Sequence, residues 1–252
     1  MRTSNWTESV SVLDRVTAVF EAFGEYDEGL GISELARRAH LPKSTVSRIA
    51  ADLVGQRLLD RDGDTLYLGV RLFELGQTVE QPRRLRQLAL PIMTDLRDVT
   101  GQTVHLAVLD GVDVVFVTIV RAGPIPKPLA RVGGRLPAHA TALGKAILAF
   151  SPHDVVLRAT SCGLMRRTPH TITEASTLLR QLVDIRALGV ATEREECALG
   201  LTCVAGAILG HGGLPTAAIS VAGTIDDLVP ERVAPAVRAA AATLSRRLMS
   251  DR

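Results

Sequence analysis

Apolar residues return every three or four positions through the first part of the chain. Between Leu13 and Phe23 this spacing predicts a helix with one apolar face. Ser33 is the predicted N-cap of a short second helix. Pro42 suits the start of a third helix, over 42–56, because the missing N–H of proline would have no partner there. The predicted buried stripe of this third helix is Val46, Ile49, Ala50 and Leu53.

A hairpin signal follows the third helix. Two short runs with apolar residues, 58–61 and 65–68, flank Asp62-Gly63-Asp64, and an Asp-Gly pair in that place is typical of a turn between two strands. A short helix, a turn, a longer helix and a hairpin, in this order, predict a winged helix-turn-helix, which places one helix in the major groove of DNA. The same spacing also fits a small helical bundle used for protein contacts.

The rest of the chain alternates helix-like and strand-like segments. Leu72, Leu75 and Val79 predict a short connecting helix, and Pro82 marks the expected domain junction. The mixture of segments over 83–252 predicts one sensor-type domain of the α/β (α+β) class. The expected helices cover 85–99, 140–150, 174–188 and 229–248, and the expected strands cover 103–109, 113–120, 190–195, 203–209 and 216–222.

The length suggests two domains, with one large domain as the alternative, and the composition suits a soluble protein with packed cores. At 252 residues, with 46% hydrophobic but only 3% aromatic residues, the cores must consist mainly of Leu, Val, Ala and Ile. Three cysteines, an odd number, do not fit a secreted disulfide scaffold. The N-terminal residues lack the apolar segment of a signal peptide, and the longest apolar stretches are too short to span a bilayer. We expect a cytoplasmic protein with no membrane partner.

The net charge of +2 is unevenly distributed. Residues 1–80 carry nine basic and thirteen acidic residues, a net −4, whereas 81–252 carry twenty and fourteen, a net +6. DNA binding therefore depends on a local charged face, and over 31–61 six basic residues outnumber three acidic ones. Arg48 is expected to read a base, because Arg–guanine pairing is the commonest specific contact, while hydroxyl groups near a helix start suit phosphates. The predicted DNA-binding side chains are Ser33, Arg37, Arg38, Lys43, Ser44, Thr45, Ser47, Arg48 and Arg61.

Several stretches resemble the IclR family of bacterial transcription regulators. They are LPKSTVSRI at 41–49, YLGVRLFELG at 67–76, RLPAHATALGKAILA at 135–149, LGVATEREECALGLTC at 188–203 and AAISVAG at 217–223, in the order of the family. The resemblance implies an N-terminal winged helix-turn-helix, a linker helix, a C-terminal GAF-like effector domain, and a homodimer that often pairs into a homotetramer. The predicted ranges of these three parts are 1–69, 70–82 and 83–252.

The Gly144-Lys145 pair resembles the end of a nucleotide-binding P-loop, but the rest of that motif is missing. A P-loop needs a glycine five positions before its second glycine, and a Ser or Thr after the lysine. This chain has His139 and Ala146 in those places, so it lacks both the glycine that lets the backbone wrap a phosphate and the hydroxyl that binds magnesium. We therefore do not expect a nucleotide-hydrolysing enzyme.

The IclR resemblance gives the same loop and helix start a different role, as part of the effector pocket. Backbone N–H groups at a helix N-terminus form an anion site, which suits a ligand carboxylate. The Glu193, Glu195 and Glu196 cluster by itself fits a solvated loop, acid–base chemistry or a metal, whereas the resemblance favours a pocket role for Glu193. The predicted effector-binding residues are Leu136, Thr141, Ala142, Leu143, Glu193, Leu201, Cys203 and Ser220.

Two departures from the family pattern make the predicted pocket less polar. Ser220 is present, but Ala222 stands where the family often has a second hydroxyl, and Leu143 stands where a small residue is common. The predicted effector is therefore a carboxylic acid with a substantial apolar part, such as an aromatic or branched acid.

Neither a metal site nor a catalytic group is predicted. Cys197 and Cys203 are six residues apart and only His211 follows them, which does not match zinc-ligand spacing, and no Ser-His-Asp arrangement can be assigned. We expect no cofactor and no enzyme, but a homo-oligomeric regulator, a repressor of a catabolic operon, on a pseudo-palindromic operator of double-stranded DNA. An activator, a DNA-binding unit fused to a metabolite-processing enzyme, and a protein-interaction module are the alternatives.

Overall fold

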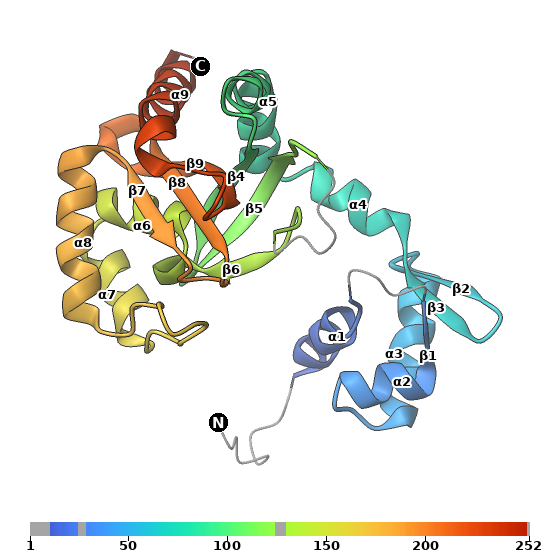
Figure 1. Ribbon diagram of the computed structural model, residues 1–252. Helices are drawn as coiled ribbons and strands as arrows, with labels where there is room; N and C mark the ends of the chain where they lie inside the picture. The colour runs from blue at the N-terminus through green and yellow to red at the C-terminus, as the bar shows by residue number, and fades with distance from the viewer. Residues whose placement is uncertain (1–10, 25–28, 124–129, 251–252) are drawn as a thin grey trace. The chain divides into compact units, whose positions relative to one another are not determined.

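Helices and a small antiparallel sheet make up the N-terminal unit, residues 1–80, of the computed structural model. The structure describes residues 11–24, 29–123 and 130–250. The sheet has the strand order β1-β3-β2 (Figure 1). In chain order the elements are α1 (Val12–Glu21), β1 (Leu30–Gly31), α2 (Ile32–Arg38), α3 (Lys43–Gly55), β2 (Leu59–Asp62), β3 (Thr65–Leu68) and α4 (Val70–Gln77).

The helix starts in this unit follow from local capping. Ser11 and Asp14 cap α1 reciprocally, each side chain accepting from the backbone N–H of the other at 3.1 and 2.9 Å. The prediction that Ser33 caps the second helix is wrong. Because Leu30 and Gly31 pair with β3, the chain enters α2 directly from a strand, and Gly31 becomes the N-cap.

The core of the unit lies between α1, α2, α3 and the sheet, and α4 buries no residue in it. All four residues of the stripe predicted for α3 are buried, which confirms that stripe. The predicted apolar face of α1 is wrong at Leu13, which is 75% exposed, because the face turned to the core carries Val19 instead. Leu35, Leu59 and Leu66, all fully buried, join α2, β2 and β3 to this core.

Short turns connect the elements around α3. His40 takes a left-handed backbone with φ of 52°, and α3 then begins at Lys43, with Pro42 one position earlier as its N-cap. The predicted hairpin is present, but its turn is two residues long, because Asp62 already pairs with Thr65 across the strands.

The second unit, residues 81–252, is built on a six-stranded sheet with the order β6-β5-β4-β9-β8-β7. Every neighbouring pair of strands in it is antiparallel, so α+β describes the observed class better than α/β. The strands are β4 (Thr103–Asp110), β5 (Asp113–Val120), β6 (Arg135–Pro137), β7 (Ala191–Arg194), β8 (Leu201–Leu209) and β9 (Pro215–Thr224).

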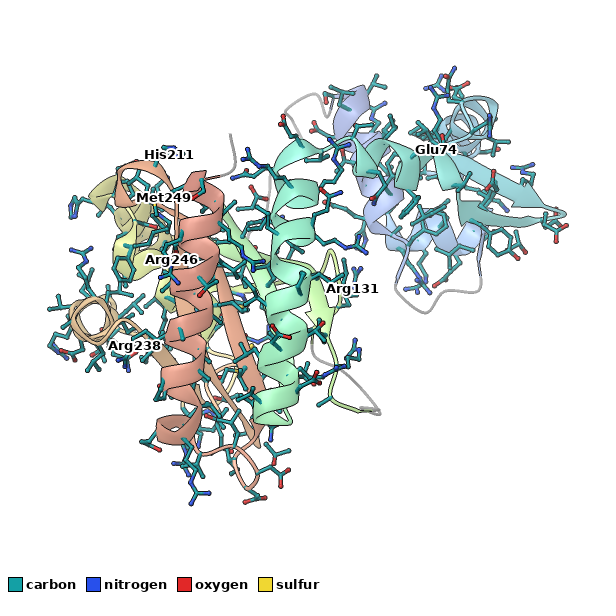
Figure 2. All side chains as sticks on the ribbon, turned by 90° about the horizontal axis from the view of Figure 1, so that it is seen from above. Glu74, Arg131, His211, Arg238, Arg246 and Met249 are labelled. Atoms are coloured by element: carbon teal, nitrogen blue, oxygen red, sulfur yellow. The ribbon has the colours of Figure 1, made fainter. Side chains whose placement is uncertain are left out.

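Helices cover both faces of this sheet. The helices α5 (Glu80–Thr100) and α9 (Pro230–Ser250) lie side by side on one face, with Arg238, Arg246 and Met249 on α9 (Figure 2). On the other face lie α6 (Ala142–Phe150), α7 (His153–Ser161) and α8 (Ala175–Leu188), with the short 3-10 helix η1 (Ala138–Ala140) before α6 (Figure 1). A second 3-10 helix, η2 (His211–Gly213), joins β8 to β9.

The expected elements of the second unit are present, with several differences. The elements predicted from the sequence do not include α7 or β6, which are nine and three residues long. Pro82, the expected domain junction, lies in the first turn of α5, where proline is tolerated, and the two units divide between Glu80 and Gln81. The predicted linker range 70–82 thus contains α4 and the start of α5. Within the described ranges, no helix is long and apolar enough to cross a membrane.

Candidate functional site

The outer face of α3 carries the polar residues predicted to meet DNA. Lys43, Ser44, Ser47 and Arg48 are exposed and Thr45 is partly exposed, on the side away from the buried stripe. In the part of the chain that the structure describes, Lys43 and Arg48 form no ion pair, so both charges are available to a polyanion.

The other predicted cations differ in whether an acidic side chain already pairs with them. Arg37 donates to Glu34 at 2.6 and 2.8 Å, and Arg38 donates to the same carboxylate at 2.8 Å. Hydrogen bonds from Arg37, which have the larger effect, and from Arg38 lower the pKa of the Glu34 carboxyl to about 2. This carboxylate therefore stays charged and offsets part of the positive charge of the two arginines. Ser33 and Arg61 are exposed, on α2 and on β2 respectively.

A cavity of about 770 Å³ lies in the second unit, on the sheet face that α6 covers. This volume falls in the usual range for sites that enclose a small molecule. The structure brings together at its wall all eight residues predicted to bind an effector, namely Leu136, Thr141, Ala142, Leu143, Glu193, Leu201, Cys203 and Ser220.

The antiparallel register of the sheet explains why residues far apart in sequence meet at this wall. Ser220 on β9 pairs with His105 on β4, and Ala222 pairs with Cys203 on β8. All four line the cavity, whereas the residues between them, such as Val221, face α5 and α9. The period of two along each strand therefore divides the sheet into a packed face and a cavity face.

The N-terminus of α6 supplies hydrogen-bond donors to the wall. The hydroxyl of Thr141 caps the helix by accepting from the N–H of Gly144 at 3.1 Å. The N–H groups of Ala142 and Leu143 have no acceptor among the described residues, as is usual in the first turn of a helix. Two uncompensated donors thus belong to residues that line the cavity.

Glu193 lines the cavity and is buried, as is Glu196, so the solvated-loop alternative for this acidic cluster does not hold for these two residues. Its Oε1 atom accepts from the N–H groups of Glu196 and Cys197 at 2.7 and 3.0 Å. Burial raises the pKa of the Glu193 carboxyl, and the hydrogen bond from Cys197 opposes that rise.

The Gly144-Lys145 pair serves packing rather than phosphate binding in this fold. A Cβ atom on Gly144 would lie within 2.3 Å of the Ala138 backbone, so only glycine lets η1 approach α6. Lys145 is completely buried and donates to Glu196 at 2.6 Å and to Gln181 at 3.1 Å. The ion pair thereby joins α6 to the turn after β7.

Ser220 has the most informative polar atom in the cavity. The residue is 1% exposed, and its Oγ atom has no hydrogen-bond partner among the described residues. Leaving a buried hydroxyl unpaired costs about 1–3 kcal/mol, so native proteins rarely retain one without a partner or a function. A ligand in the cavity can supply that partner.

Comparison with known proteins shows which family has this architecture. The model of the IclR helix-turn-helix domain matches residues 12–63, and the model of the C-terminal domain of bacterial IclR transcriptional regulators matches 77–246. The chain belongs to the IclR family. It is therefore a DNA-binding, ligand-responsive transcriptional regulator of the winged type that the sequence resemblance implied.

Named relatives and solved structures agree with this assignment. The Escherichia coli transcriptional repressor IclR is 33% identical over 232 residues, which cover 90% of this chain and 85% of that protein. The Klebsiella pneumoniae repressor AllR is 29% identical over 231 residues, with 89% and 84% covered. An IclR homologue from Microbacterium hydrocarbonoxydans, solved with 4-hydroxybenzoate, is similar with a TM-score of 0.85 at 32% identity, covering 94% of this chain and 99% of that one.

Sequence reasoning missed several wall residues of this IclR-family protein. His105 and Phe116 line the cavity with ring centroids 5.4 Å apart in an edge-to-face arrangement, and Arg121 lies near them. Burial, the larger cause, and the positive charge of Arg121 lower the pKa of His105 to about 4, so its imidazole is neutral at pH 7. No local motif marks these residues, because strand pairing alone brings them to the wall.

The two cysteines at the wall have thiols that burial holds in the neutral form. Burial raises the pKa of the Cys197 thiol to about 11 and that of Cys203 well above its usual range, so both stay protonated at neutral pH. Among the described residues, no three His, Cys, Asp or Glu side chains gather in a way that suits a metal ion. The cavity therefore offers hydrogen bonds and apolar contact.

Proposed function

We propose that this regulator is a repressor of a catabolic operon, acting in the cytoplasm on a pseudo-palindromic operator as a homodimer or homotetramer. The named repressors among its relatives support the sign of regulation. In this proposal residues 1–69 read DNA, 70–82 connect the units, and 83–252 bind the effector. Occupation of the cavity changes operator affinity by favouring one arrangement of the paired DNA-binding units, which requires the ligand to bind the two arrangements unequally.

Exposed apolar side chains support the oligomeric part of the proposal. On and just after α4, Val70, Phe73, Leu75 and Val79 are each at least 50% exposed. An exposed cluster of this kind usually marks a protein–protein contact. Sedimentation at micromolar concentration is expected to give a dimer or tetramer, and a monomer would contradict the proposal.

The DNA-reading role of α3 is tested by two matched arginine variants. Arg48→Ala is expected to weaken specific operator binding by about 1–3 kcal/mol. Arg37→Ala is the control and is expected to lose less, because Glu34 already offsets the charge of Arg37. Gel-shift titrations on operator and on unrelated DNA measure both effects. Equal losses on the two DNAs would assign Arg48 to phosphate contacts, and unchanged affinity would remove it from the interface.

The unpartnered Ser220 hydroxyl inside a mainly apolar cavity is the observation that carries the effector assignment. The free N–H groups of Ala142 and Leu143 suit a carboxylate, while Phe116 and Leu143 suit an apolar body. The relative solved with 4-hydroxybenzoate supports an aromatic acid as one member of this class.

Calorimetry against benzoate, 4-hydroxybenzoate, branched-chain acids and glyoxylate tests this assignment. We expect the aromatic or branched acids to bind more tightly than glyoxylate, because burial of apolar surface contributes about 25 cal/mol for each Å². Ala222→Phe, which fills the cavity from β9, is expected to abolish binding. A clear preference for glyoxylate would refute an apolar effector.

A further inference from the structure

Three ionisable groups are buried together beside the ligand cavity, and their charges do not balance. Lys145 donates to Glu196 at 2.6 Å, so this pair is neutral as a whole. Glu193, which is 1% exposed, adds a second carboxylate. The two backbone N–H groups that its Oε1 atom accepts from carry no net charge. The cluster therefore holds one excess negative charge whenever both carboxylates are ionised.

Glu193 is the member of this cluster that lines the cavity. It shares the cavity wall with Ser220, whose hydroxyl is buried and has no partner among the described residues. Burial already raises the pKa of Glu193, and the Glu196 carboxylate acts in the same direction. A carboxylate ligand in the same cavity adds another like charge, and two carboxylates that share a buried site rarely both stay ionised.

We propose that an anionic effector enters this cavity together with one proton, and that Glu193 holds that proton. The neutral carboxyl group of Glu193 then offers a hydrogen-bond donor to the ligand instead of repelling it. The proton comes from solvent, and no covalent bond of the ligand changes. This inference rests on the proposed function, in which the effector is a carboxylic acid.

Two cations lie near Glu193. The Lys145 charge lowers the pKa of Glu193 but less than burial raises it, and Arg167 donates to the backbone carbonyl of Cys197 at 3.3 Å rather than to Glu193. Lys145, from α6, is already engaged by Glu196. Cys197, in the turn after β7, and Cys203, on β8, both have thiols whose pKa burial raises, so they stay neutral. Burial also raises the pKa of Glu196, but the charge and hydrogen bond of Lys145 oppose that rise, so Glu193 is the carboxylate that takes the proton in this proposal.

Three other titratable groups line the cavity and define the competing outcomes. His105, on β4, is neutral at pH 7, and its protonation is opposed by burial and by Arg121. Arg121 is exposed after β5 and can attract an anion without any proton uptake. Asp227, after β9, adds a further negative charge. Glu193 differs from all three because its carboxylate is buried and is itself the excess negative charge of the cluster.

Calorimetry on the full-length protein counts the protons. Benzoate and 4-hydroxybenzoate are titrated in buffers of different ionisation enthalpy at pH 6, 7 and 8. We expect uptake of about one proton per ligand, with an affinity that falls about tenfold per pH unit once the pH exceeds the pKa of free Glu193. Glu193→Gln is expected to bind without proton uptake and with little pH dependence. Asp184→Asn, which removes an exposed carboxylate on α8 outside the cavity, is the control and should retain the uptake, and His105→Gln tests whether the wall imidazole takes the proton instead.

The outcomes separate this inference from the proposed function. Binding of either acid to the wild type without proton uptake would overturn the inference and leave the effector class standing, and this result needs no variant. Uptake that persists in folded Glu193→Gln, or disappears in His105→Gln, would place the proton elsewhere and also overturn it. Failure of every carboxylate to bind, in a protein that still binds its operator, would refute the effector class and the inference together.

Discussion

Removal of the Lys145 ammonium is the sharpest test of how the cavity wall is built. Lys145→Met keeps most of the side-chain volume but leaves the buried Glu196 carboxylate without its partner at 2.6 Å, and leaves Gln181 without its donor at 3.1 Å. The two charged side chains are 0% and 8% exposed, so water does not replace the lost contact. Breaking a buried pair from one side destabilises a protein by about 3–5 kcal/mol.

Urea denaturation followed by circular dichroism measures this effect. With an m value of about 2 kcal/mol per M, the unfolding midpoint of the second unit should fall by about 1.5–2.5 M. Arg158→Met is the matched control, because its pair with Asp154 is exposed at 64% and 66%, and exposed pairs contribute about 0–1 kcal/mol. Adding Glu196→Gln to Lys145→Met should restore part of the stability. A loss below about 1 kcal/mol for Lys145→Met would refute the buried pair.

Three further predictions concern the same wall. Ser220→Ala should stabilise the ligand-free protein in thermal unfolding and weaken effector binding in calorimetry, because the Ser220 hydroxyl lacks a partner until a ligand binds. A ligand-free variant less stable than the wild type would show that the hydroxyl already has a hydrogen-bond partner. Gly144→Ala should destabilise the second unit, because its Cβ atom would overlap the Ala138 backbone. Gly76→Ala in α4 is the control, since its Cβ atom would meet no other atom. Equal melting temperatures for the two variants would contradict the close approach of Gly144 to Ala138. Burial raises the folded-state pKa of Glu193, so the native state binds more protons than the unfolded state. The stability of the wild type should therefore fall relative to that of Glu193→Gln as pH rises from 5 to 8. If the stabilities of the two proteins changed in parallel with pH, the pKa of Glu193 would not be raised.

The sequence predicts best where one helix or one motif contains the whole signal. The buried stripe of α3 follows from local periodicity, and the Asp-Gly hairpin follows from turn chemistry, apart from a one-residue difference at Asp62. The family motifs also brought Glu193 and Ser220 to the wall of one cavity, although their role there stays a prediction.

What escaped prediction depends on contacts between distant segments. His105 and Phe116 are ordinary strand residues until the pairing of β4 with β5 and β9 turns them toward one cavity. Lysine is rarely buried, and no local pattern marks Lys145 as an exception. Its ion pair with Glu196, a distant residue in the sequence, explains its burial. Ser33 has the right chemistry for a cap, but strand pairing at Gly31 fixed the helix start earlier.

The central claim is that a ligand in this cavity changes how tightly the chain binds its operator. The most direct measurement is fluorescence anisotropy on an operator fragment recovered from genomic DNA by the protein itself, with and without a cavity ligand identified by calorimetry. We predict a change in operator affinity of roughly 5–150-fold, the usual size of coupling between two sites, and no change in Ala222→Phe. Operator affinity that stays the same while calorimetry shows the cavity occupied would contradict the account.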